Sequence, residues 1–285
     1  MKKFIIKYNF ILLILLGLIL NSCSTRFHSK EENGARKIYN LKYGEEKRQN
    51  MDVFLPKTAE KQIPLVIIVH GGAWKFGYKE RMIRIQKFLF LNNIPSININ
   101  YRLLRNGILY TDQLEDISKA IEKSQELSTE WKIDPNDFIL LGESSGAHLA
   151  LLYGYRNPHK IKKIISLSGP TDFYSEKYRN SNYFRKTKGL FQQVVGANYE
   201  NNEEAFKKAS PIANVSAVPT LIFQGDRDFL VNKNQGLALD SVLTSKNIAH
   251  QLVYLKNSGH LPRRVKWKRD SLIFPVILSF IKQLN

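Results

Sequence analysis

Hydrophobic positions follow two alternating patterns along the chain. Continuous apolar runs rich in β-branched residues predict strands buried on both faces, and they cover residues 65–70, 94–101, 138–141, 161–167, 220–223 and 251–255. Apolar residues at helical spacing fill residues 79–92, 112–127, 147–155 and 232–245. Strands that alternate with helices predict an α/β fold, a mostly parallel sheet with helices on both faces.

Three segments depart from this alternation. Residues 36–43 and 49–55 have strand character on either side of Gly44 and several charged residues, which predicts an antiparallel hairpin. Residues 169–217 are rich in Tyr, Asn, Lys and Phe and hold no clear strand. We expect them to form a small, mostly helical insertion that partly covers a site. Pro275 interrupts the last apolar pattern, so it either kinks a helix or opens one.

The first residues have the character of a targeting signal. Three lysines precede an apolar run over residues 10–20, which is too short for a comfortable membrane span and has the length of a signal-peptide core. The sequence Leu20-Asn21-Ser22-Cys23 resembles the lipobox of bacterial lipoproteins. That resemblance implies cleavage before Cys23 and its lipidation. An uncleaved anchor and an ordinary secretory signal are the alternatives.

The predicted organisation is therefore a signal peptide over residues 1–22, a flexible tether over residues 23–34 and one folded domain over residues 35–285. A chain of 285 residues suits a single large domain. The expected location is the bacterial cell envelope, with a lipid anchor in a membrane and the domain facing the periplasm or the exterior.

Charge, cysteine content and ligand spacing limit the partners and cofactors that the chain is expected to bind. The formal net charge is +18, but the basic residues are spread along the chain and no nucleic-acid motif accompanies them, which indicates a solvated basic surface and no nucleic-acid partner. One cysteine excludes an internal disulfide framework. No metal-ligand spacing is present, so neither a metal nor an organic cofactor is predicted.

The segment Gly142-Glu143-Ser144-Ser145-Gly146 matches Gly-x-Ser-x-Gly. It follows one predicted strand and opens a predicted helix, the context of a nucleophile elbow. Ser144 is therefore the predicted nucleophile, and a plain Gly/Ser turn is the alternative. The backbone N–H of Ser145, at the helix N-terminus, is the expected donor to an oxyanion.

A second glycine-rich turn ends the strand at residues 65–70. Glycine lets the main chain approach a reacting carbonyl and direct N–H groups toward it. Gly71 and Gly72 are therefore assigned to the other half of the oxyanion hole. His70 is interpreted as a structural residue that fixes this loop.

A serine nucleophile needs a general base. The chain order nucleophile, acid, histidine is expected for α/β hydrolases, and only His159, His250 and His260 follow Ser144. His260 comes directly after the last predicted strand and is the predicted base. Asp228 is the predicted acid, while Asp226 is the alternative and is expected to hold the turn instead.

Six motifs in this order carry a family resemblance; they are His70–Trp74, Asn100–Leu103, Gly142–Ala150, Ser210–Ile212, Gln224–Asp228 and Ser258–His260. They resemble the esterase/lipase branch of the α/β hydrolases, and within it the feruloyl/acetyl-xylan-esterase-like group near the hormone-sensitive-lipase-like family. The likeness spans residues 36–284. Two departures, Ser144-Ser-Gly-Ala-His148 and Gln224-Gly225, leave the predicted triad untouched.

The resemblance implies an eight-stranded, mostly parallel α/β-hydrolase sheet and hydrolysis of carboxylic esters through an acyl-enzyme on Ser144. The implied substrate is a small-molecule or carbohydrate-linked ester. Three alternatives remain open: an arylformamidase-like amide hydrolase, a peptidase, and a non-catalytic surface-binding lipoprotein. The peptidase is disfavoured because the chain has no room for the large extra domain usual in peptidases of this fold.

Overall fold

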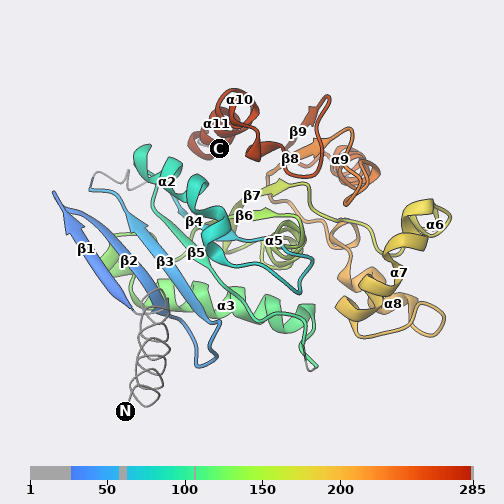
Figure 1. The fold of residues 1–285 in the computed structure, drawn as a ribbon, viewed down its shortest axis with the longest axis horizontal. Helices are drawn as coiled ribbons and strands as arrows, with labels where there is room; N and C mark the ends of the chain where they lie inside the picture. The colour runs from blue at the N-terminus through green and yellow to red at the C-terminus, as the bar shows by residue number, and fades with distance from the viewer. Residues whose placement is uncertain (1–26, 58–62, 106, 284–285) are drawn as a thin grey trace, which may run out of the picture.

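A computed structural model describes residues 27–57, 63–105 and 107–283. Nine strands in this part of the chain form one sheet in the order β1-β2-β3-β5-β4-β6-β7-β8-β9 (Figure 1). The strands are β1 (His28–Glu32), β2 (Ala35–Lys42), β3 (Asn50–Leu55), β4 (Leu65–Val69), β5 (Ser96–Ile99), β6 (Phe138–Glu143), β7 (Ile161–Leu167), β8 (Thr220–Gly225) and β9 (His250–Leu255).

The sheet is mostly parallel. β5, β4, β6, β7, β8 and β9 run in one direction, whereas β1, β2 and β3 pair antiparallel at one edge. The predicted hairpin is confirmed as β2 and β3, and the predicted α/β sheet is confirmed by the strands that follow. The carboxyl ends of the parallel strands lie at one edge of the sheet, where sites form in folds of this class.

Helices cover both faces of the sheet, as expected for a parallel sheet. They are α2 (Ile83–Leu91), α3 (Tyr110–Glu126), α4 (Ser128–Trp131), α5 (Ser145–Arg156), α6 (Glu176–Arg179), α7 (Asn182–Val195), α8 (Glu203–Ala209), α9 (Asn234–Ser245), α10 (Lys266–Lys268) and α11 (Phe274–Lys282). Short 3-10 turns are η2 (Lys79–Met82), η3 (Pro211–Ala213) and η4 (Pro262–Arg264), and η5 (Arg269–Ile273) is a π-helix.

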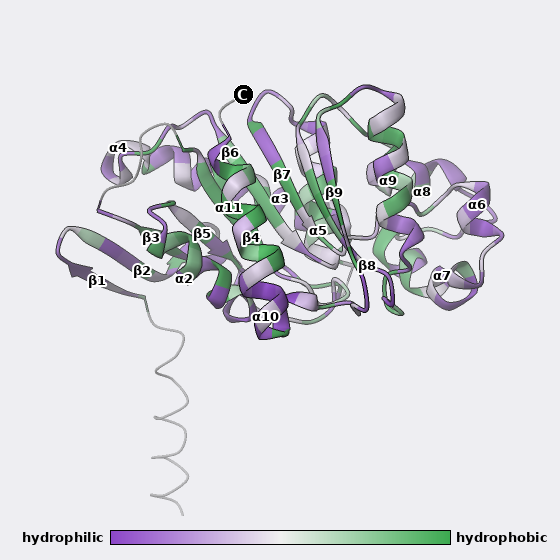
Figure 2. Cartoon of the chain, turned by 90° about the horizontal axis from the view of Figure 1, so that it is seen from above, coloured by the Kyte–Doolittle hydropathy of each residue, from purple (hydrophilic) through white to green (hydrophobic). Residues whose placement is uncertain are grey.

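Alternate residues of each central strand enter two separate cores. In β4, Leu65, Ile67 and Val69 join the core beneath α3, α5 and α9, while Val66 and Ile68 join the core beneath α2 and α11. Figure 2 shows hydrophobic residues gathered along the central strands and the helices that cover them. This double burial explains why the central strands are continuous apolar runs in the sequence.

The sheet holds one strand more than the eight predicted, and that strand corrects the predicted tether. Residues 28–32 pair with β2 over the whole of β1. The link is Asn33-Gly34, with φ of 52° and 77°, and Asn-Gly is the favoured pair for a tight hairpin turn. β1 is exposed along its whole length, so it needed no apolar pattern and none predicted it. Residues 1–22 and Cys23 lie outside the described residues.

The segment predicted as an insertion carries α6, α7, α8 and η3 between β7 and β8, and these helices lie together at one end of the molecule (Figure 1). Pro275 lies in the first turn of α11, so it opens that helix. Across the described residues, no helix has both the length and the apolar character needed to cross a bilayer.

Candidate active site

The turn between β6 and α5 has the shape of a nucleophile elbow. Ser144 has φ 55° and ψ −122°, a sparsely populated conformation for a non-glycine residue. A Cβ atom on Gly146 would lie 2.3 Å from the carbonyl oxygen of Val69 and 2.4 Å from that of His70, so only glycine lets α5 begin this close to β4. The packing holds the Ser144 side chain at the carboxyl edge of the sheet.

Ser144, His260 and Asp228 form a hydrogen-bonded row. The Ser144 Oγ lies 2.8 Å from His260 Nε2, and His260 Nδ1 lies 2.7 Å from Asp228 Oδ2. The second Asp228 oxygen accepts the N–H groups of Leu230 at 3.0 Å and Val231 at 2.9 Å. Because the buried carboxylate can only accept, Nδ1 carries a proton toward it, and Nε2 is left to accept the serine hydroxyl proton.

The other candidates of the sequence analysis lie elsewhere. Asp226 accepts the backbone N–H of Ser258 at 3.0 Å, and backbone hydrogen bonds lower the pKa of its carboxyl. Asp226 therefore fixes the loop that carries His260. His250 Nε2 lies 3.2 Å from Asp240, and His159 is exposed in a turn before β7.

The turn after β4 lies against the elbow. A Cβ on Gly71 would come within 2.7 Å of the Glu143 carbonyl oxygen and 3.0 Å of the Ser144 Cβ, so only glycine lets the main chain come this close to Ser144. Gly71 and Gly72 line the same cavity as Ser144 and His260. Ser145 is the first residue of α5, and N–H groups in the first turn of a helix have no helical acceptor.

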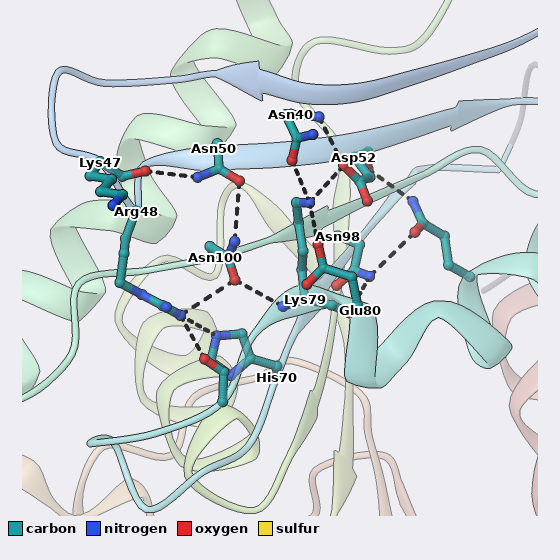
Figure 3. A network of polar contacts seen from close by, with 12 residues as sticks. Asn40, Lys47, Arg48, Asn50, Asp52, His70, Lys79, Glu80, Asn98 and Asn100 are labelled. Carbon is teal, nitrogen blue, oxygen red and sulfur yellow. Dashed lines mark hydrogen bonds and ion pairs between the residues drawn. The ribbon is translucent and has the colours of Figure 1, made fainter. Parts of the chain in front are cut away.

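A polar network next to His70 holds this turn on the side away from the cavity's lining residues (Figure 3). The Arg48 guanidinium lies 3.2 Å from His70 Nε2, the His70 ring stacks on Tyr101 at 4.3 Å, and the Tyr101 hydroxyl donates to the His70 carbonyl at 2.8 Å. Burial lowers the pKa of His70 to about 3. His70 is therefore neutral and structural.

The same network holds the segment that follows the turn. Lys79, almost fully buried, lies 2.9 Å from the Asp52 carboxylate of β3, and its N–H donates to Asn100 at 2.8 Å. Asn100 also lies within 3.4 Å of Arg48. The start of η2, and with it one wall of the site, is thus fixed to the sheet (Figure 3).

A buried ion pair that no sequence motif predicts joins the elbow to the loop that carries His260. Arg263, three residues beyond His260, donates two hydrogen bonds to the Glu143 carboxylate, the Nη2 bond at 2.6 Å. Both side chains are 6% exposed. Glu143 is the variable position of Gly-x-Ser-x-Gly, and nothing in that motif specifies a partner 120 residues away.

His148 was also missed. Its Nδ1 accepts the Trp74 indole N–H at 3.2 Å, and its Nε2 therefore carries a proton for the Ala209 carbonyl at 2.8 Å. Burial lowers the pKa of His148 to about 4, so the ring is neutral. It connects Trp74, in the loop after β4, to the end of α8.

A cavity of about 420 Å³ opens onto Ser144 and His260. Its walls are mostly apolar, and α7 supplies Tyr183, Thr187, Leu190 and Phe191. Two arginines, Arg81 and Arg264, also line it. No group of three or more His, Cys, Asp or Glu side chains in the described parts of the chain is placed to hold a metal ion.

The sheet order, the elbow and the hydrogen-bonded row define an α/β hydrolase. The family comparison is more specific, because the BD-FAE family model matches residues 51–243. The chain belongs to the BD-FAE family.

Individual curated proteins also match the chain. The chain is 24% identical over 243 residues to an isoprenylcysteine alpha-carbonyl methylesterase of Arabidopsis thaliana, covering 76% of this chain and 55% of the relative. It is 27% identical over 121 residues to a kynurenine formamidase of Salmo salar, covering 41% of this chain and 38% of that protein. The chain spans about half the length of the curated methylesterases it matches.

Among solved structures, a truncated form of a carbohydrate esterase from gut microbiota superposes with a TM-score of 0.76 at 21% identity. The alignment covers 89% of this chain and 98% of that one. At this identity the likeness concerns the fold alone, and it includes nearly the whole of the other chain.

Proposed function

We propose that the protein is a serine hydrolase of carboxylic esters in which Ser144, His260 and Asp228 act as the catalytic triad. The observation that carries the proposal is the continuous row from Ser144 Oγ through the imidazole to the buried Asp228 carboxylate. Such a row supplies the base that a serine hydroxyl needs at neutral pH.

In the first step, Ser144 Oγ attacks the ester carbonyl carbon while His260 Nε2 takes the hydroxyl proton. The tetrahedral intermediate collapses, the proton passes from His260 to the departing alcohol oxygen, and an acyl-enzyme remains on Ser144. In the second step, His260 takes a proton from water, the hydroxide attacks the acyl carbonyl, and the carboxylic acid leaves as Ser144 regains its proton. Asp228 orients the imidazole and stabilises its cation.

Backbone N–H groups stabilise the developing oxyanion. Ser145 offers one from the N-terminus of α5, a helix of twelve residues, and the Gly71-Gly72 turn offers the other from across the site. Donors fixed by secondary structure need no reorganisation during the reaction, which is the condition under which such stabilisation is large.

The relatives favour an ester over an amide. Four of the plant methylesterases match across three quarters of the chain or more, whereas the kynurenine formamidases match less than half. An arylformamidase-like activity is the second candidate, and a non-catalytic binding protein is the third. The hydrogen-bonded row disfavours the third candidate, because ligand binding alone does not need it.

The test is turnover of short 4-nitrophenyl esters and of N-formyl-arylamines by the wild-type protein and by Ser144→Ala. Ester hydrolysis that disappears in the variant supports the proposal. Preferential turnover of the formamides would favour the arylformamidase-like activity instead. A folded wild-type protein inactive toward both would favour the binding protein.

We also propose that Cys23 carries a lipid that anchors the protein to a membrane of the cell envelope. The support is the Leu20-Asn21-Ser22-Cys23 sequence after an apolar run. In cells fed a labelled fatty acid, the wild-type protein should take up the label and partition with membranes. Cys23→Ser should do neither, and labelling of that variant would contradict the anchor.

A further inference from the structure

The cavity next to Ser144 carries an excess of positive charge. Its ionisable lining includes Arg81, Arg264, Glu143 and His260. The Glu143 carboxylate is neutralised by its buried partner Arg263, and His260 is neutral when it accepts the serine proton. Two guanidinium groups therefore remain without a compensating charge in the lining.

Neither guanidinium is engaged by a carboxylate. In residues 27–57, 63–105 and 107–283, no ion pair forms at Arg81 or Arg264. The Arg81 guanidinium lies over the Tyr78 ring at 5.4 Å, a contact that steadies the side chain and leaves its N–H donors available. Both arginines are exposed enough to receive a ligand from solvent.

One buried side chain links the backbone segments that carry the two arginines. Arg81 lies in η2 and Arg264 in η4. Arg263, the chain neighbour of Arg264, donates to the Arg81 carbonyl oxygen at 3.3 Å while it binds Glu143. The ion pair that joins the elbow to the histidine loop therefore also holds the two arginines beside the nucleophile.

We propose that Arg81 and Arg264 form an anion-binding subsite and that the preferred substrates are esters bearing a carboxylate or another oxyanion close to the scissile bond. This rests on the proposed esterase function. A guanidinium pairs an oxyanion with short, charge-assisted hydrogen bonds. The apolar walls of the cavity lower the local dielectric constant, which strengthens that attraction.

The test compares the full-chain protein on two matched pairs of esters. The first pair is 4-acetoxybenzoate and neutral 4-acetoxybenzamide, with the charge on the alcohol side. The second is mono-4-nitrophenyl adipate and its neutral methyl ester, with the charge on the acyl side. In at least one pair, the anionic-to-neutral ratio of kcat/KM should fall tenfold or more in Arg81→Gln/Arg264→Gln. In the wild-type protein, 0.5 M NaCl should reduce that ratio, because salt screens exposed charges.

Arg84→Gln is the matched control, since Arg84 is an exposed arginine of α2 outside the cavity lining, and it should keep the wild-type ratio. Equal ratios in the wild-type protein and the double variant, for both pairs, would overturn the subsite but leave the esterase proposal standing. Binding of 4-hydroxybenzoate and of monomethyl adipate to Ser144→Ala, measured by calorimetry, tests the alcohol side and the acyl side of the subsite without turnover. Affinities for both compounds that are unchanged by the two arginine substitutions would also overturn it.

Discussion

The carboxyl edge of the sheet and the α6–α8 segment meet at one cavity, but they are built differently. At the edge, main-chain atoms in tight contact fix Ser144 and Gly71. In the α6–α8 segment, side chains on one face of α7 reach the cavity while much of the helix is exposed. The segment rests on aromatic contacts, such as Phe173 against Phe191 at 3.9 Å.

This difference assigns separate tasks to the two regions. Catalytic groups tolerate little displacement, so they lie where the backbone is over-determined. The α7 wall can change its side chains without moving the elbow. Substitutions at the sheet edge should therefore change kcat or the fold itself, and substitutions in α7 should change which ester is preferred.

A large effect on activity is expected from the buried acid of the row. Asp228→Asn should lower kcat about 10⁴-fold with the fold retained, because the amide cannot hold His260 in the required tautomer. Steady-state kinetics and circular dichroism measure the two properties. Asp226→Asn, the matched variant two residues away, should lose far less activity. A larger loss in Asp226→Asn would reverse the assignment of the acid.

Breaking the ion pair beneath the site should cost stability. Arg263→Met leaves the Glu143 carboxylate buried without a partner, a change that typically lowers the free energy of unfolding by about 3 to 5 kcal/mol. Urea denaturation measures it, and Glu143→Gln/Arg263→Met should recover part of the loss. Arg179→Met breaks an exposed pair of the α6–α8 segment and should cost about 1 kcal/mol or less. Equal losses would refute the contrast between the regions.

Low pH should weaken the contact by which His148 connects the loop after β4 to the α6–α8 segment. His148 has its folded-state pKa lowered to about 4 by burial, against an unfolded value of about 6.5. The unfolded chain therefore binds more protons below pH 6.5, and stability falls from there toward pH 4. Between pH 7 and 5, His148 alone should account for about 2 kcal/mol.

His148→Gln isolates this contribution. Urea titrations at pH 7 and pH 5 should give a smaller difference in unfolding free energy for the variant than for the wild-type protein. The same pH dependence in both proteins would mean that His148 is not neutral in the folded state.

The smallest effect is expected in the α7 wall. Leu190→Ala enlarges the cavity, so kcat/KM for longer acyl chains should rise relative to kcat/KM for acetate. The expected rise is up to about tenfold, because one or two methylene groups in an apolar pocket typically change kcat/KM by that factor. A series of 4-nitrophenyl esters from acetate to octanoate measures it. Leu91→Ala, on the exposed side of α2, is the control. An unchanged chain-length profile in Leu190→Ala would remove α7 from substrate selection.

The sequence predicted most of the fold because its central strands are buried on both faces and therefore stand out as apolar runs. β1 was not predicted, because an edge strand that is exposed on both sides carries no such apolar pattern. Glycine spacing and chain order predict Ser144, Asp228 and His260 as a set, and the structure places their side chains in one hydrogen-bonded row. The pair of Glu143 with Arg263 could not be found this way, since it exists only where two distant loops meet. Arg81 and Arg264 likewise line one cavity only because the folded chain brings their two loops together.

The proposed mechanism requires that Ser144 becomes covalently acylated, and peptide mass spectrometry after treatment with an alkyl fluorophosphonate detects this step. Such reagents react with a serine only when an adjacent base activates it. We predict one adduct, on the peptide that contains Ser144, absent from Ser144→Ala and from protein unfolded before treatment. An unmodified Ser144 in the folded wild-type protein, or an adduct on another serine, would show that Ser144 is not the nucleophile.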